Sequence, residues 1–423
     1  MSVEPRHFLP DRVRDLAPPA AERLETLRRR LLDHYLLRGY EFVNPPLLEY
    51  ADTLSSGAAS DLKRNLVYLA ENADTADASA RLALRADFTP QVARLDSIRA
   101  APHQVSRYCY AGTILLRQPR SFNGVRNPMQ LGAELLGSSG ELADLEILTL
   151  LLDSLMPLLE EDDFNCNDSR DNPHNRTKLL RLSDNRIIHQ LCDLAQLEGE
   201  IREQILSLLQ RRSLNQLAPL LEPRRIARPE VAEVIAALIQ LPAMFGADLI
   251  NSEYWAQLAG LDSRLAEMLK RLEQLAHTIA AAHPELQLVI DLADMSGYTY
   301  HTAHTFTLFN GHTAIAQGGR YDGIGSYFGY ARPAIGFSID MDSLLFTLPQ
   351  PPLTPCVWVA AGQLPAAKEW IDEALATGRR VIHAVTSDEQ PPTNCTHRLT
   401  KTKQGDWELQ PITSAHTRDA TQA

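Results

Sequence analysis

Two polar residues, Gln130 and Glu134, stand in an otherwise apolar run that reads MQLGAELLG from residue 129 to residue 137. The run predicts a β-strand, and residues four apart on a strand project from the same face. A buried carboxylate is costly unless it is paired or hydrogen-bonded. Glu134 is therefore predicted either to hold a ligand or to belong to a structural ion pair, with Gln130 beside it.

A second pair of polar residues, Asp87 and Thr89, lies in the segment LRADFTPQVARL at residues 84–95. An isolated aspartate before a helix is often only a capping residue. Further along, Gly318-Gly319 precedes Arg320 and Tyr321. Paired glycines usually mark a turn, so this motif is read either as a turn or as part of a site to which Tyr321 contributes.

Two histidines, His301 and His304, lie three apart in the segment GYTYHTAHTF at residues 297–306. On the strand that this segment predicts, they would face opposite ways, which argues against joint metal ligation.

The five cysteines are scattered without a CxxC pair, which favours free thiols over a disulfide framework or a zinc site. We expect neither a metal nor a cofactor.

The elements that must position these residues follow from apolar spacing. Strands are predicted at residues 107–116, 129–136, 286–293, 300–309, 312–317 and 335–340, with a long polar loop between the first two. A Leu/Ala-rich helical insertion at about 195–284 separates the sheet segments, and residues 160–178 are predicted to be a surface insertion. This pattern predicts an α+β domain over 1–348 and a short α/β appendage over 349–423.

Charge and composition narrow the classes of function. Forty-one basic residues against 53 acidic ones leave a net charge of −12, which argues against a nucleic-acid partner because phosphate contacts need basic surfaces. No run approaches the length of a transmembrane helix, so none is expected. The N-terminal segment carries charges where a secretory signal has its apolar core, so we expect a cytoplasmic protein.

Four segments in order resemble the catalytic domain of histidyl-tRNA synthetase, over roughly residues 8 to 347. The segment 84–95 resembles its Leu-Arg-Pro-Glu-Gly-Thr stretch, and 129–137 resembles the distal strand of class II motif 2. The segment 297–306 resembles Arg-Gly-Leu-Asp-Tyr-Tyr-Thr, and 314–341 resembles Gly-Gly-Arg-Tyr-Asp-Gly running into motif 3. The resemblance implies a class II synthetase-like antiparallel sheet flanked by helices.

Amino-acid activation provides a test of this resemblance. It brings a carboxylate against the α-phosphate of ATP, and class II enzymes oppose the repulsion with arginines. The motif 2 arginine aligns with Leu115, or with Arg117 if it has shifted by two residues. The other two arginines align with Ser296 and Ser343. Because each such charge contributes about 10²–10³-fold to a rate, the resemblance implies a pseudoenzyme.

More of the residues that form the amino-acid pocket match the synthetase motifs than do the positions of the activating arginines. Histidine presents an ammonium and an imidazole, which carboxylate, carbonyl and hydroxyl groups hold best. The resemblance implies a histidine site formed by seven candidate residues: Asp87, Thr89, Gln130, Glu134, Tyr300, His301 and Tyr321. His301 replaces the second tyrosine of the Tyr-Tyr pair.

The C-terminal tail also departs from a synthetase. About seventy residues follow Pro352, with one visible strand–helix–strand unit, where a synthetase has a complete anticodon-binding domain. A histidine pocket without the activating arginines resembles the ATP phosphoribosyltransferase regulatory subunits. That resemblance implies a short-form catalytic subunit as partner, L-histidine as effector, and a class II-type dimer within a hetero-oligomer.

Two other functions remain open on the sequence: a divergent histidyl-tRNA synthetase, and a module that senses tRNA or histidine. The sequence also leaves open whether inhibitory histidine binds the ancestral pocket or a subunit interface. It does not give the stoichiometry, or the roles of the insertion at 160–178 and of the tail.

Overall fold

The computed structural model describes residues 9–55, 60–69, 81–101, 103–119, 124–160, 177–295, 301–349, 355–392 and 394–412. The chain divides into two compact units, Met1–Pro349 and Gln350–Ala423, which are treated separately below. The polar segment expected to be a surface insertion falls outside these ranges except for its ends. Within the described part, no helix is both long and apolar enough to span a membrane.

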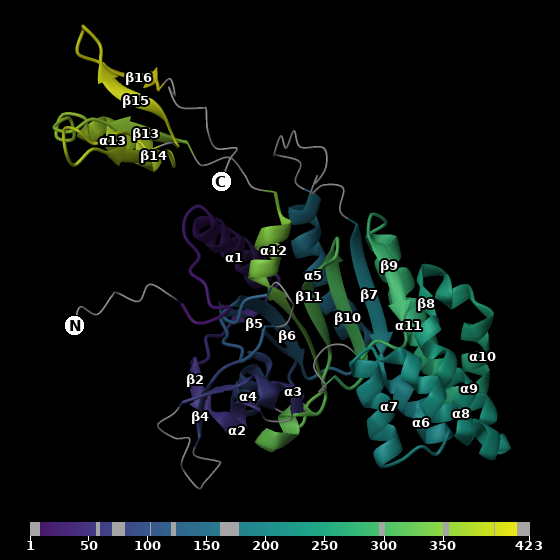
Figure 1. Cartoon of the computed structure of the whole chain (residues 1–423). Helices are drawn as coiled ribbons and strands as arrows, with labels where there is room; N and C mark the ends of the chain where they lie inside the picture. Colours follow the sequence, from purple (N-terminus) through teal and green to yellow (C-terminus); the bar gives the residue numbers. More distant parts are fainter. Residues whose placement is uncertain are drawn as a thin grey trace, which may run out of the picture. The chain divides into compact units, whose positions relative to one another are not determined.

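A nine-stranded sheet forms the centre of the first unit, in the order β1-β5-β6-β12-β11-β10-β7-β9-β8 (Figure 1). The strands are β1 (Glu41–Phe42), β5 (Ser106–Thr113), β6 (Met129–Leu136), β7 (Lys178–Asp184), β8 (Phe245–Gly246), β9 (Gln287–Asp291), β10 (His304–Asn310), β11 (Thr313–Arg320) and β12 (Ala334–Asp340). The α+β class is confirmed. The sheet is mainly antiparallel, as expected, but it is mixed, because β1 pairs with β5, and β7 with β9, in parallel.

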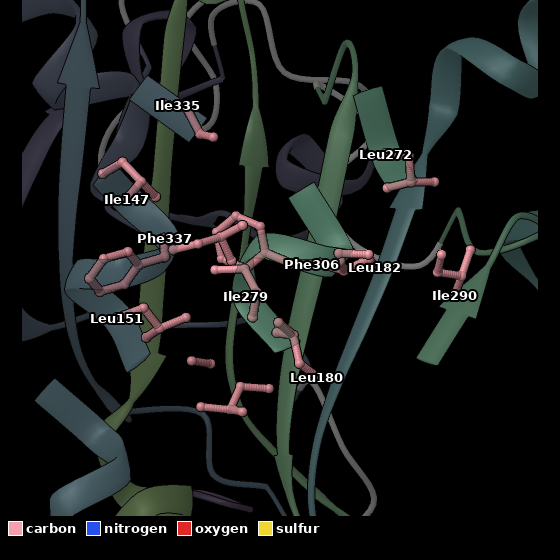
Figure 2. Packing of buried hydrophobic residues seen from close by; sticks show 14 of the residues in the cluster. Ile147, Leu151, Leu180, Leu182, Leu272, Ile279, Ile290, Phe306, Ile335 and Phe337 are labelled. Carbon is pink, nitrogen blue, oxygen red and sulfur yellow. The ribbon is translucent and has the colours of Figure 1, made fainter. Parts of the chain in front are cut away.

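The two faces of this sheet differ in character because strand residues alternate between them. On one face, Phe337 of β12 and Phe306 of β10 pack with Leu182 of β7 and with Ile147 and Ile279 from two covering helices (Figure 2). Those helices are α5 (Glu141–Glu160) and α11 (Ser263–Ala282), and α1 (Ala20–Leu37) contributes to the same core. The opposite face carries polar residues from four strands: Gln130, Glu134, Thr305, Thr307, Gln317, Ser338 and Asp340.

Three strands are shorter than the sequence predicts, those expected at 107–116, 286–293 and 300–309, and the first and last of these differences affect the site. The strand expected at 107–116 ends at Thr113, because the backbone amide of Leu115 donates to Arg85 O and that of Leu116 to Arg126 O. The strand expected at 300–309 begins at His304. His301 therefore precedes the strand, and the argument that it faces away from His304 does not apply.

The helical insertion lies on the side of the sheet that ends in β9 and β8 in Figure 1, and it shares the large core. Its helices are α7 (Glu200–Gln210), α8 (Leu217–Ala227), α9 (Ala232–Gln240), α10 (Glu253–Leu261) and α11, and α6 (Asn185–Leu194) leads into it. A small three-stranded sheet, β2-β4-β3, lies near the N-terminus. Its strands are β2 (Leu48–Tyr50), β3 (Val67–Tyr68) and β4 (Leu82–Leu84), and the remaining helices of this unit are α2 (Ala51–Leu54), α3 (Ser60–Asn65), α4 (Thr89–Arg99) and α12 (Met341–Thr347).

The second unit has more structure than the single strand–helix–strand that the sequence predicts. Its sheet has the order β14-β13-β15-β16, with strands β13 (Cys356–Val359), β14 (Arg380–His383), β15 (Cys395–Lys401) and β16 (Trp407–Pro411) and the helix α13 (Lys368–Ala376). The expectation of free thiols is wrong here, because Cys356 and Cys395 form a disulfide. Pairing of β13 with β15 places these two cysteines opposite each other although 39 residues separate them.

Candidate functional site

Glu134 lies at the centre of a cage of hydroxyl groups on the polar face of the sheet. The hydroxyl groups of Thr89 and Tyr110 donate to its Oε1 at 2.7 and 3.2 Å, and that of Tyr321 donates to Oε2 at 2.6 Å. The residue is 1% exposed. Burial raises the pKa of Glu134 to about 8, and the hydrogen bonds from Tyr321 and Thr89 oppose that rise. Glu134 is thus a carboxyl group poised between its charged and neutral forms.

Gln130 links the sheet to the segment that carries Asp87. Its Nε2 donates to Asp87 Oδ1 at 2.8 Å, and its Oε1 accepts from the backbone amide of Phe88 at 3.3 Å. Asp87 is 2% exposed and lies two residues before Thr89, the first residue of α4. The structure therefore brings the four residues together as two hydrogen-bonded pairs, Asp87 with Gln130 and Thr89 with Glu134, which connect the same two segments.

Residues outside the candidate set support this group. Tyr110 of β5 stacks on Phe88 with ring centroids 4.5 Å apart, and the Arg85 guanidinium lies 3.9 Å from the Phe88 ring. Arg85 donates to the carbonyls of Thr113 and Pro45, and burial lowers the pKa of Arg85 to about 10. Sequence reasoning overlooked Tyr110, although its place on the strand that precedes Glu134 could have indicated it.

A glycine leaves the space that the Glu134 carboxylate occupies. A Cβ atom at Gly336, on the neighbouring strand β12, would lie 1.6 Å from Glu134 Oε2. The close approach of these two strands at this point thus requires glycine at position 336.

Two cavities adjoin on this face. A pocket of about 10 Å³ is lined by Thr89, Glu134, His301, Gln317, Gly318, Tyr321, Gly336, Phe337 and Ser338. A larger cavity of about 760 Å³ shares Gln317 and Ser338 with it and extends to α12 and the segment at 124–125. His301 is half-buried, and the loss of solvation around its ring lowers the pKa of the imidazole to about 4, so the ring is neutral at physiological pH. The other candidates of the same segment, Ser296 and Tyr300, lie outside the described residues.

Comparison with known proteins identifies the group to which this arrangement belongs. The family model described as histidyl-tRNA synthetase matches residues 12–344. The ATP phosphoribosyltransferase regulatory subunit of Pseudomonas syringae pv. tomato is 33% identical over 98% of this chain and 100% of its own length. That of an Azoarcus species is 34% identical over 96% of this chain and 99% of its own.

The chain belongs to the family of ATP phosphoribosyltransferase regulatory subunits. A crystal structure described as an ATP phosphoribosyltransferase regulatory subunit/histidyl-tRNA synthetase from Bacillus halodurans has the same fold, with a TM-score of 0.71. It is 20% identical and the match covers 92% of this chain and 96% of that one. A histidyl-tRNA synthetase from a Nostoc species gives a TM-score of 0.67 at 15% identity, covering 96% of this chain and 97% of its own. The class II synthetase-like fold expected from the sequence is confirmed.

In this regulatory-subunit fold, two of the three positions aligned with activating arginines can be located. Leu115 is half-buried and follows the end of β5, while the alternative position, Arg117, is exposed. Ser343 lies in the first turn of α12, where its amide donates to Asp340 Oδ1 at 2.9 Å, and it lines the larger cavity.

The charges of the larger cavity in this family member are mainly acidic. Arg14 reaches its wall, but its Nη2 lies 2.5 Å from Asp342 Oδ1, so the two charges offset each other. Asp340 adds a second carboxylate to the same wall. Over the described ranges, no group of three or more histidine, cysteine, aspartate or glutamate side chains is arranged to hold a metal ion.

Proposed function

We propose that this chain is a non-catalytic regulatory subunit of ATP phosphoribosyltransferase. It is needed, in this proposal, for the first step of L-histidine biosynthesis and confers feedback inhibition by histidine. One observation carries the proposal: the hydroxyl cage around Glu134 is intact, while the positions aligned with activating arginines are Leu115 and Ser343. The site therefore retains the groups that suit an amino acid and has lost those that suit ATP.

The pocket chemistry favours histidine as the effector. The Glu134 carboxyl group and the Tyr321 hydroxyl are suited to the two nitrogens of an imidazole, because each can donate or accept a hydrogen bond. Asp87 and Gln130 do not line the pocket itself, but they lie on the segments that supply Thr89 and Glu134 and offer oxygen acceptors for the α-ammonium. A pocket of about 10 Å³ is nearly filled by its own side chains, so histidine must displace some of them on entry. Binding and a conformational change are therefore linked.

The surface around β1 supports the class II-type dimer that we propose within the hetero-oligomer. β1 is the edge strand of the large sheet and pairs only with β5 among the described strands. Four apolar side chains near it are exposed: Leu37 by 88%, Phe42 by 45%, Ile98 by 72% and Val105 by 40%. An edge strand with exposed apolar neighbours is a surface that association would bury.

The other partner that we propose is a short-form catalytic subunit, and the site of action that we propose is the cytoplasm. The net charge of −12 argues against a role for nucleic acid. A ligand can shift an assembly only through its different affinities for two states, so histidine must favour one state of the complex.

Co-purification with the short phosphoribosyltransferase of the same organism tests the proposal. We expect a stable complex whose condensation of ATP with phosphoribosyl pyrophosphate depends on this chain and is inhibited by histidine. A coupling of about 1–3 kcal/mol between histidine and the active state is typical of such systems. Separate elution of the two proteins, with activity that ignores both this chain and histidine, would refute the assignment.

A further inference from the structure

A buried ion pair joins the end of β11 to the first turn of α5. The Arg320 guanidinium contacts Asp144 Oδ1 through Nε at 3.0 Å and also through Nη2. It donates as well to the carbonyls of Ser138 at 3.0 Å and Gly140 at 3.4 Å. The side chains of Arg320 and Asp144 are only 5% and 6% exposed. All three nitrogens of the guanidinium therefore have acceptors in one short stretch of chain.

The residue after Arg320 belongs to the opposite side of the sheet. Arg320 pairs with Ile335 and projects to the face that α5 covers, whereas the Tyr321 hydroxyl reaches Glu134 on the polar face. The Tyr321 amide donates to Ala334 O at 2.8 Å, and this bond holds the turn after β11 against β12. An anchor on one side of the backbone thus determines where the tyrosine ring enters the pocket on the other side.

The turn that follows β11 also holds the segment that contains His301 and Thr302. Arg320 O accepts from the Thr302 amide at 2.7 Å and from its hydroxyl group at 3.4 Å. That hydroxyl oxygen in turn accepts from the Asp322 amide at 3.1 Å. Thr302 directly follows His301, which lines the pocket. The main chain at Arg320 is therefore hydrogen-bonded to the segment that carries His301 and continues directly into Tyr321, and both of these residues line the pocket.

We infer that Arg320 is a positioning residue for the histidine pocket and acts through Tyr321. This inference rests on the proposed function, because it concerns histidine at the Glu134 cage. Arg320 does not line the pocket, so its effect must pass through the corner that it anchors. The planar guanidinium matches a carboxylate and two carbonyls at once, which the single ammonium of a lysine cannot reproduce.

A double-mutant cycle tests the route of this effect. Histidine affinity is measured by calorimetry on the full chain carrying Tyr321→Phe, Arg320→Met, or both substitutions. Loss of a hydrogen bond to a charged group costs about 10- to 100-fold in affinity, so we expect each single substitution to weaken binding by that order. Because both act through one hydroxyl group, Arg320→Met should have little further effect when Tyr321 is already phenylalanine.

Three further variants separate positioning from general stability. Arg320→Lys should bind histidine more tightly than Arg320→Met but less tightly than the wild type. If Arg320→Met does not fold, Asp144→Asn takes its place, and it should also weaken histidine binding. Arg107→Met is the matched control, because Arg107 joins α5 to β5 through Glu146 at 2.7 and 2.8 Å. This control should leave histidine affinity within about twofold of the wild type.

The outcomes distinguish a failure of the proposed histidine pocket from a failure of the positioning role of Arg320. If Tyr321→Phe leaves histidine affinity unchanged, the site itself is elsewhere and the proposed pocket fails with this inference. If Tyr321→Phe weakens binding but Arg320→Met does not, or if the two effects multiply, only the positioning role of Arg320 is overturned.

Discussion

The Tyr321 hydroxyl group lies 2.6 Å from Glu134 Oε2, across 187 positions of sequence. This bond connects the corner after β11 to the middle of β6 and closes the hydroxyl cage on the side opposite Thr89. Both groups are fully buried, and burial together with the Glu134 carboxyl group raises the pKa of Tyr321 well above its usual value. The tyrosine therefore remains a hydrogen-bond donor at every pH at which the protein would be studied.

Substitution of Glu134 should weaken histidine binding. Glu134→Gln preserves shape but can no longer ionise, and we expect a loss of about 10- to 100-fold in affinity because bound histidine then has no charged hydrogen-bond partner at this position. Calorimetry on the full chain measures it, with Glu146→Gln on α5 as a control whose affinity should not change. An unchanged affinity for Glu134→Gln, with the fold intact, would move the histidine site to a subunit interface.

Glu134 should also make the stability of the ligand-free protein depend on pH. Its pKa rises from 4.5 in the unfolded chain to about 8 in the folded one, so the folded state binds the proton more tightly. The stabilising contribution is therefore fully present below pH 4.5 and is lost as pH rises towards 8.

Denaturant titrations between pH 5 and 9 measure this effect. We expect the wild type to lose a few kcal/mol more than Glu134→Gln across this range, since one pKa unit corresponds to about 1.4 kcal/mol. Parallel curves for the two proteins would show that Glu134 keeps an ordinary pKa in the folded state.

Gly336→Ala should disrupt the pocket more than the addition of one methyl group suggests. The added methyl group would lie 1.6 Å from Glu134 Oε2, so the carboxylate would have to leave its cage. We expect a loss of at least tenfold in histidine affinity, with a fall in the melting temperature. Gly260→Ala on α10 is the control, because a Cβ there meets nothing within 4 Å. Equal behaviour of the two variants would contradict the close approach of β12 to Glu134.

Adenylate formation should be absent, and one arginine should not restore it. Leu115 and Ser343 stand where arginines would offset the repulsion between ATP and a carboxylate, and Asp340 adds negative charge to the larger cavity. Histidine-dependent pyrophosphate exchange should stay below a thousandth of a working synthetase's rate, both for the wild type and for Ser343→Arg. Exchange above that level in the wild type would contradict the pseudoenzyme proposal.

The sequence by itself determined the strand 129–136 and the common face of Gln130 and Glu134, because both depend only on the two-residue period of a strand. It also indicated the polar residues Thr89 and Tyr321, which the structure bonds to Glu134, and Asp87, which it bonds to Gln130. Their roles in binding histidine stay predictions.

Only the tertiary structure decided which side chains complete the cage. Tyr110 and Gly336 reach Glu134 because β5 and β12 pair with β6 in one register, and a shift by one residue would remove both contacts. The same reason applies to the Cys356–Cys395 disulfide, which strand pairing creates between cysteines that no sequence spacing connects. Local periodicity is a property of neighbouring residues, whereas register is settled by contacts between segments far apart in the chain.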